Sequence, residues 1–234
     1  MFKTQEAFRD WGKYAHFSQL YLDETVVEEL LLSIKHLAGL TLLNLKDCKY
    51  LSSFPSAIYD FLTPLEILTL SGCRIQPPKP SHLLGLSQIW FFDPPNPEPE
   101  PINLLLPKSF SVLSSLKSLD ISDCNLSGEA FLDDLSCLSS LRSLNLSRNN
   151  FIRLPDSISQ LSKLKLLCMD SCSKLRSFPY LPLGTRHVMA RGCTSLANYS
   201  NKVVVWTSGE VGFTFINCLS LLKDDKGKST DDFL

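Results

Sequence analysis

The chain has 234 residues, of which 44% are hydrophobic, and its 23 Lys and Arg residues nearly balance 24 Asp and Glu for a formal net charge of −1. A near-neutral chain without a basic run lacks the charge pattern of nucleic-acid-binding proteins. No stretch approaches the roughly 20 apolar residues of a membrane-spanning helix, and the charged first residues lack the apolar region of a secretory signal, so we expect neither nucleic acid nor a membrane span.

A pattern of the form L-x-x-L-x-L recurs along the chain, and a cysteine or asparagine follows each strong copy. A weak first copy holds Phe17, Leu20, Leu22 and Thr25; the strong copies end at Cys48, Cys73, Cys124, Asn149 and Cys172; a degenerate copy holds Thr185, Val188, Ala190 and Cys193. A period of roughly two dozen residues with this pattern is typical of leucine-rich repeats.

One interval between strong copies, from Cys73 to Cys124, is about twice the normal period. We expect an eroded repeat within it, whose strand would hold Leu86, Ile89 and Phe91. Prolines crowd residues 77–101 and forbid a helix there. The interval is therefore predicted to bulge from the repeat array as a surface loop, with a polyproline II segment presented to a partner as the alternative.

Each repeat is predicted to form a short strand, a turn and a helical or extended return, and no repeat can bury its leucines alone. The expected fold is an α/β leucine-rich-repeat solenoid, with a curved parallel sheet on the concave side and short helices or turns on the convex side. The repeat domain is expected at residues 17–196 with about seven to eight repeats, followed by the beginning of a β-rich module at 197–222 and a polar tail at 223–234.

The recurring cysteines are predicted to be structural. Cys48, Cys73, Cys124, Cys172 and Cys193, with Asn149 in the same place, should point inward at the corner of each repeat, where a small donor can approach backbone carbonyls. Free thiols indicate a reducing compartment. A zinc site of Cys168, Cys172, His187 and Cys193 is not expected, because Cys168 falls on an outward strand position; no metal or cofactor is predicted.

Candidate binding residues occupy the variable positions between the leucines, which should project from the concave face. Their mixed polarity suits the recognition of another protein. The candidates, in chain order, are Tyr21, Asp23, Asn44, Lys46, Asp47, Glu66, Thr69, Lys117, Asp120, Asp123, Arg142, Asn145, Arg148, Lys165, Asp170, His187 and Arg191. Glu24, Ser71, Ser122, Ser147, Cys168 and Met189 share these positions.

The phrases LTLLNLKDCKYLSSFPSAI, LRSLNLSRNNFIRLPDSISQLSKLKLL and LRSFPYLPLGTRHVMARGCTSLANYS resemble the repeat region of plant intracellular disease-resistance proteins. The class is the one with a Toll/interleukin-1-receptor-like domain and a nucleotide-binding domain, neither of which lies in this chain. The two clipped repeats before Gly192-Cys193-Thr194-Ser195-Leu196 are the most specific feature, and Phe213 to Cys218 resembles the opening of the β module that follows the repeats in this class.

The resemblance implies a non-catalytic recognition segment of an innate immune receptor, which binds a pathogen effector or a guarded host protein and restrains a switch domain in the same chain. A cytoplasmic or nuclear location follows from it. No catalytic motif is present, and the histidines lie in different repeats. An extracellular receptor-type repeat protein, with glycans at sequons such as Asn145-Leu-Ser, and a stand-alone scaffold or decoy remain as alternatives.

Overall fold

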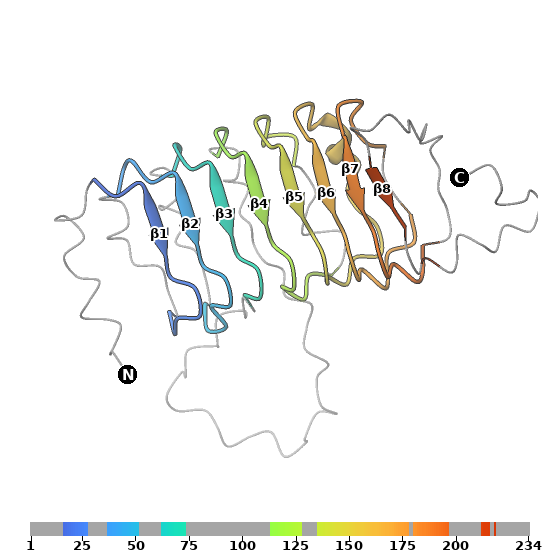
Figure 1. Cartoon of the computed structure of the whole chain (residues 1–234), viewed down its shortest axis with the longest axis horizontal. Coiled ribbons are helices and arrows are strands. Elements are labelled where there is room, and N and C mark those ends of the chain that lie inside the picture. The colour runs from blue at the N-terminus through green and yellow to red at the C-terminus, as the bar shows by residue number, and fades with distance from the viewer. Residues whose placement is uncertain are drawn as a thin grey trace, which may run out of the picture.

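The computed structural model describes residues 16–27, 37–51, 62–73, 113–127, 135–177, 180–196, 212–215 and 218. Within these residues, eight short strands form one parallel sheet in chain order (Figure 1). They are β1 (Gln19–Tyr21), β2 (Leu42–Asn44), β3 (Ile67–Thr69), β4 (Ser118–Asp120), β5 (Ser143–Asn145), β6 (Leu166–Cys168), β7 (His187–Met189) and β8 (Gly212–Thr214). The predicted fold class, a leucine-rich-repeat solenoid, is confirmed.

The central residue of each strand is aligned with the central residue of the next, as in Leu43 with Leu68 and Leu144 with Leu167. The first, middle and last leucines of each strong repeat are fully or almost fully buried, whereas the residues on either side of the middle leucine are intermediate or exposed. Successive side chains of a strand point to opposite faces of the sheet, which explains this alternation of burial. The leucines therefore form one continuous core behind the sheet.

The expectation of an eroded repeat between the third and fourth strands is wrong. β3 pairs directly with β4, with Leu68 opposite Leu119, so no strand separates them in the sheet. The residues assigned to the missing strand, Leu86, Ile89 and Phe91, lie outside the described part of the chain. Each edge of a strand pairs with one neighbour, so the hydrogen bonds between β3 and β4 leave no place in the sheet for a further strand between them.

The sheet also continues past residue 196, where the repeat domain was predicted to end. β8 pairs in parallel with β7, placing Phe213 opposite Val188. Cys218 follows the centre of β8 at the same distance as Cys193 follows the centre of β7, and it is buried. The eighth strand therefore comes from the segment predicted to open a separate β module, and Cys218 joins the corner series.

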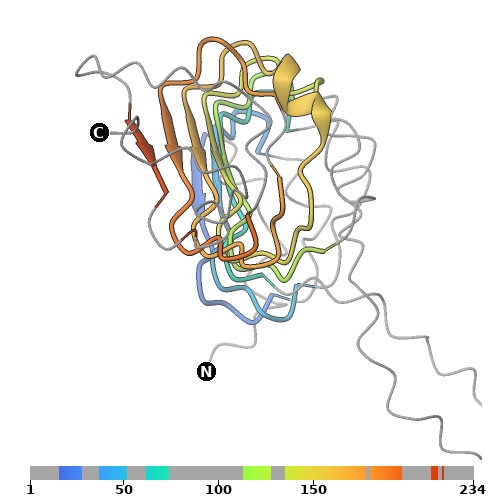
Figure 2. The same ribbon diagram turned by 90° about the vertical axis from the view of Figure 1, so that its right-hand side faces the viewer.

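The return segments close the core on the side opposite the sheet (Figure 2). After Pro155 the chain forms a 3₁₀ helix, η5 (Asp156–Gln160), whose Ile158 is fully buried. Proline suits this place because its fixed φ starts a helical turn that needs no amide donor at that position. The return segment at Arg153 also bridges in parallel to Ser177 of the next repeat.

A left-handed residue precedes the corner residue in seven successive repeats. Its φ lies between 54° and 74° at Glu24, Asp47, Gly72, Asp123, Arg148, Ser171 and Gly192. In the first six of these repeats its amide bonds to the neighbouring repeat, as in Asp47 N to Ser71 O at 2.7 Å. A side chain in this conformation costs roughly 1 kcal/mol relative to glycine. The turn is thus imposed on five non-glycine residues by the pairing of neighbouring repeats.

Alanine at Gly72 is expected to cost more stability than alanine at Gly192, although both residues have nearly the same φ. A Cβ at Gly72 would lie 2.3 Å from Asp47 Oδ1, whereas a Cβ at Gly192 would meet nothing closer than 3.7 Å. We expect Gly192→Ala to destabilise by about 1 kcal/mol through backbone strain and Gly72→Ala by about 2 kcal/mol. Urea denaturation measures both, and equal losses would contradict the close approach of Asp47.

Candidate functional site

The predicted binding residues all lie outside the core, and none is buried. They fall into three rows that cross the strands on the solvent face of the sheet. One row precedes the strands and includes Glu66, Lys117, Arg142 and Lys165; one flanks the strand centres and includes Tyr21, Asn44, Thr69, Asp120, Asn145 and His187; one follows the strands and includes Asp23, Lys46, Asp47, Asp123, Arg148, Asp170 and Arg191. The structure therefore gathers them on one surface but spreads them over seven strands.

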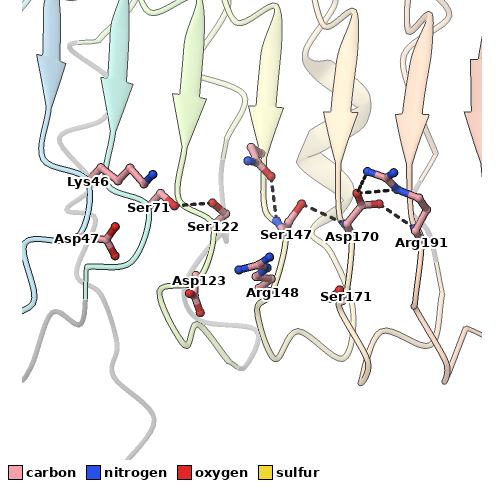
Figure 3. Close-up of a pocket in the computed structure, with 11 residues that line it drawn as sticks. Lys46, Asp47, Ser71, Ser122, Asp123, Ser147, Arg148, Asp170, Ser171 and Arg191 are labelled. Atoms are coloured by element: carbon pink, nitrogen blue, oxygen red, sulfur yellow. Dashed lines mark hydrogen bonds and ion pairs between the residues drawn. The ribbon is translucent and has the colours of Figure 1, made fainter. Parts of the chain in front are cut away.

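A groove of about 610 Å³ follows the ends of β2 to β7, and we call it the strand-end groove. Figure 3 shows its polar side chains reaching into the space beyond the arrowheads. Seven of its lining residues were predicted from the sequence as binding candidates, namely Lys46, Asp47, Asp123, Asn145, Arg148, Asp170 and Arg191, and the others are Ser71, Ser122, Ser147 and Ser171. The groove is therefore a polar surface that crosses six strands.

Short hydrogen bonds fix the centre of this groove. Asp120 Oδ1 accepts from the hydroxyl of Ser122 at 2.7 Å, and the Ser122 and Ser71 hydroxyls lie 2.8 Å apart. Asn145 Nδ2 donates to Asp120 Oδ2 at 3.1 Å and Asn145 Oδ1 accepts from the amide of Ser147. Ser122 was expected to project outward from this face, but it is buried, and its amide and hydroxyl both donate to Asp120 Oδ1.

An ion pair closes the groove at its β6–β7 end. Asp170 accepts hydrogen bonds from the Arg191 backbone amide at 2.8 Å and from Arg191 Nε at 2.9 Å, with a further contact from the guanidinium Nη2 (Figure 3). Burial alone would raise the pKa of Asp170, but the hydrogen bonds and charge of Arg191 outweigh it and lower that pKa below its usual value. Asp170 therefore stays ionised at neutral pH, and its carboxylate is already occupied.

Four charges of the groove have no side-chain hydrogen bond or ion pair to another described residue: Lys46, Asp47, Asp123 and Arg148. Lys46 and Arg148 lie on different strands with the fixed polar centre between them (Figure 3). Charges that are held on a rigid edge and left without a partner can pair with charges on a bound protein at little cost in conformational entropy. These four are therefore the charged groups of the groove that are left unpaired within the described part of the chain.

Apolar and sulfur-containing side chains lie on the outer face on either side of the polar centre. Tyr21 and Ile67 are exposed apolar side chains on β1 and β3. On β6 and β7, the thiol of Cys168 lies 3.8 Å from the Met189 sulfur, and burial raises the pKa of Cys168. The methionine thioether adapts its shape to a partner surface, and aromatic side chains are enriched at interfaces. Apolar contact areas therefore flank the polar centre.

The corner residues form a second polar system, inside the repeats. Each corner cysteine donates from Sγ to a carbonyl of the preceding repeat, as in Cys48 to Leu22 O at 3.0 Å and Cys73 to Leu45 O at 2.9 Å; Cys124, Cys172, Cys193 and Cys218 do the same. Burial raises the pKa of Cys124 and of Cys193 to about 12, so these thiols keep their protons. The prediction that the cysteines are inward donors is confirmed.

The described residues contain no group of three metal-ligating side chains, and none of the described helices is long and apolar enough to cross a membrane. Two residues of the outer face were missed from the sequence. Ser171 lines the groove from a left-handed turn position, and Arg186 extends the row of Lys117, Arg142 and Lys165 to β7. Arg186 could have been found, because it precedes Val188 as Lys165 precedes Leu167.

Comparisons with protein families find leucine-rich repeats in two parts of the chain. A model described as "Leucine Rich Repeat" matches residues 140–161, and another described as "Leucine Rich repeat" matches residues 112–130. Among solved structures, the leucine-rich repeat domain of the type III effector XopL superposes with a TM-score of 0.60 over 91% of this chain and 65% of that domain, at 18% identity. That likeness supports the fold alone.

Curated relatives match most of the chain. It is 33% identical over 229 residues to "Disease resistance-like protein DSC1" of Arabidopsis thaliana, covering 88% of this chain and 19% of that protein. It is 31% identical to "Disease resistance protein RPS4B" of the same plant, covering 90% of this chain and 15% of that protein. "TMV resistance protein N" of Nicotiana glutinosa is 36% identical over 64% of this chain and 13% of its own length. The chain thus spans about a fifth or less of these relatives.

Proposed function

The chain is a leucine-rich-repeat protein homologous over most of its length to plant disease-resistance proteins, and from this premise we propose that it is the protein-recognition segment of an innate immune receptor. Its ligand is a protein, either a pathogen effector or a guarded host protein. In a longer receptor, the same repeats restrain a nucleotide-binding switch domain by contacts within the chain. The proposed location is the cytoplasm or the nucleus.

The strand-end groove carries this proposal. It presents both signs of charge, Lys46 and Arg148 against Asp47 and Asp123, with no side-chain partner among the residues that the structure describes, on a scaffold fixed by backbone pairing of neighbouring repeats. A surface of mixed charge selects a partner with the complementary arrangement and rejects others through like-charge contacts. The groove residues come from separate strands and serve to bind, and we assign them no catalytic step.

A binding experiment with plant extract tests the proposal. The full chain, carrying a photo-crosslinker, is exposed to extract from leaves undergoing a defence response, and captured proteins are identified by mass spectrometry. The variant Lys46→Ala/Arg148→Ala removes two unpaired cations of the groove. The control Lys174→Ala/Arg176→Ala removes two exposed cations from the return side.

We expect the wild type and the return-side control to capture the same proteins, and the groove variant to lose them or retain them at least roughly tenfold more weakly. Equal capture by all three proteins would contradict a recognition role for the groove. Circular dichroism confirms that the variants are folded, which is expected because both groove side chains are exposed.

The extracellular alternative gains no support from Asn145, the sequon residue at the centre of the outer face. Its Nδ2, the atom that would carry a glycan, donates to Asp120 Oδ2 at 3.1 Å. A glycan there would leave this nitrogen a single N–H and would fill the groove. Detection of a glycan on Asn145 in the native protein would therefore favour the extracellular alternative over the one proposed here.

A further inference from the structure

The outer face carries a second charged surface, at the opposite ends of the strands from the groove. It consists of the residue two positions before the strand centre in four consecutive repeats, and we call it the basic row: Lys117, Arg142, Lys165 and Arg186. Three of its members were candidates from the sequence. Unlike the groove, which holds both acids and bases, the basic row carries one sign of charge.

The backbone fixes the spacing of the basic row. The carbonyl of each member accepts the amide of the next: Arg142 N bonds to Lys117 O at 2.8 Å, Lys165 N to Arg142 O at 2.8 Å, and Arg186 N to Lys165 O at 2.9 Å. Neighbouring parallel strands lie about 4.8 Å apart, so the four Cα positions span about 14 Å across the sheet. Arg142, Lys165 and Arg186 are exposed, and Lys117 is partly exposed.

Like charges this close repel one another, and an acidic partner would reduce this repulsion. The chain itself supplies one carboxylate to the row. Glu66, in the same position of the β3 repeat, places Oε1 2.6 Å from Lys117 Nζ. A carboxylate one strand away thus fits the spacing of the row. Beyond Lys117, Lys165 Nζ reaches only the Gly184 carbonyl at 3.0 Å, and Arg142 has no side-chain partner among the described residues.

We propose that the basic row is a docking surface for an acidic, extended segment of a partner protein, which crosses the strands from β4 to β7. This inference deepens the proposed function and rests on it for the nature of the partner, a protein. An extended chain advances about 3.4 Å per residue, so roughly five residues would cover the row. A single row on a chain of net charge −1 favours a short acidic peptide over a long polyanion.

The spacing of the basic row also predicts which property of the acidic segment determines binding. Alternate side chains of an extended peptide lie about 6.8 Å apart, whereas row members lie about 4.8 Å apart. The two periods do not match, so recognition depends on flexible Lys and Arg side chains adjusting to each carboxylate. The number of acidic residues will therefore matter more than their order along the segment.

The test uses a fluorescein-labelled octaglutamate peptide and the full chain, with binding followed by fluorescence anisotropy at about 50 mM salt, where screening is weak. The variant Arg142→Glu/Lys165→Glu reverses two charges of the row, and Lys174→Glu/Arg176→Glu makes the same change of net charge on the return side. We expect the row variant to bind at least roughly tenfold more weakly than the wild type, and the control to change affinity by less than about threefold.

Three results would overturn the proposal: no binding of the peptide by the wild type, equal weakening in both variants, or tighter binding of oligothymidylate or anionic vesicles that the row variant abolishes. If the charge reversal prevents folding, Arg142→Gln/Lys165→Gln serves in its place, with an expected loss of at least roughly threefold. The groove variant Lys46→Ala/Arg148→Ala leaves the row intact. If this variant still binds the peptide but no longer captures proteins from plant extract, the groove and the basic row are distinct binding surfaces.

Discussion

Replacing Asn149 with alanine is expected to destabilise the protein by about 3–5 kcal/mol, because it leaves three buried backbone groups without their partner and removes one of the two donors to a fourth, the Leu146 carbonyl. Asn149 is 2% exposed. Its Oδ1 accepts from the amides of Cys124 at 3.2 Å and Leu126 at 3.0 Å. Its Nδ2 donates to the carbonyls of Ile121 and Leu146, both at 2.9 Å. Urea or thermal unfolding of the variant measures the loss.

Cysteine at position 149 is the informative control. In the other repeats, a corner cysteine donates from its thiol to a carbonyl of the preceding repeat. The backbone amide of the corner residue in that preceding repeat then donates within its own repeat, as in Cys48 N to Leu45 O at 3.2 Å. We expect Asn149→Cys to recover this arrangement and to cost about 1–2 kcal/mol. Equal losses for Ala and Cys would mean that the side-chain donor at the corner contributes nothing.

Asn150→Ala provides a second control in the same turn. Asn150 is only partly buried, its amide bonds to Leu126 O, and its side chain donates to Asn125 Oδ1 at the surface. Alanine keeps the backbone bond, so the expected loss is within about 0.5 kcal/mol. A loss at position 150 as large as that at 149 would show that the turn, rather than the buried amide, is what the mutation damages.

The corner positions show how much of this fold can be predicted from the sequence. The equivalence of Asn149 with the cysteines followed from its spacing after the leucines, and the structure places all six predicted corner residues in the core. The left-handed turn before each corner was not predicted. Residues as different as Glu24, Arg148 and Gly72 occupy it. The conformation is set by pairing with the next repeat, so no single residue type marks this position in the sequence.

The eight strands of the described residues are not the eight that the repeat spacing predicted. The interval between β3 and β4 contributes no strand between them, and β8 supplies the eighth. β8 carries glycine and threonine at flanking positions and lacks the leucine pattern, so only the spacing of Cys218 could have revealed it. For the outer face, sequence position predicted which side chains are exposed, but it could not predict that Ser122 would be buried by Asp120 and Ser71.

Replacing Phe151 with alanine is the second change expected to have a large effect, about 3–5 kcal/mol. Phe151 is 1% exposed and is the largest of the fully buried side chains among the described residues. It enters the core from the return segment after Asn149, beside Leu154 and Ile158. Its neighbour Ile152 is 46% exposed, so Ile152→Ala removes apolar atoms from the same segment without opening a cavity and should cost less than about 0.5 kcal/mol.

The loss at Phe151 should also be local, because each repeat of a solenoid contacts only its neighbours. β5 pairs with β4 and β6 alone, and the bridge from Arg153 to Ser177 joins its return segment to the next one. Hydrogen exchange measured by mass spectrometry should accelerate in the repeats of β4 to β6 while protection of β1 and β2 stays unchanged. Uniform acceleration from β1 to β7 would instead show that the whole array unfolds as one unit, and that a weakened repeat lowers the stability of the groove along its full length.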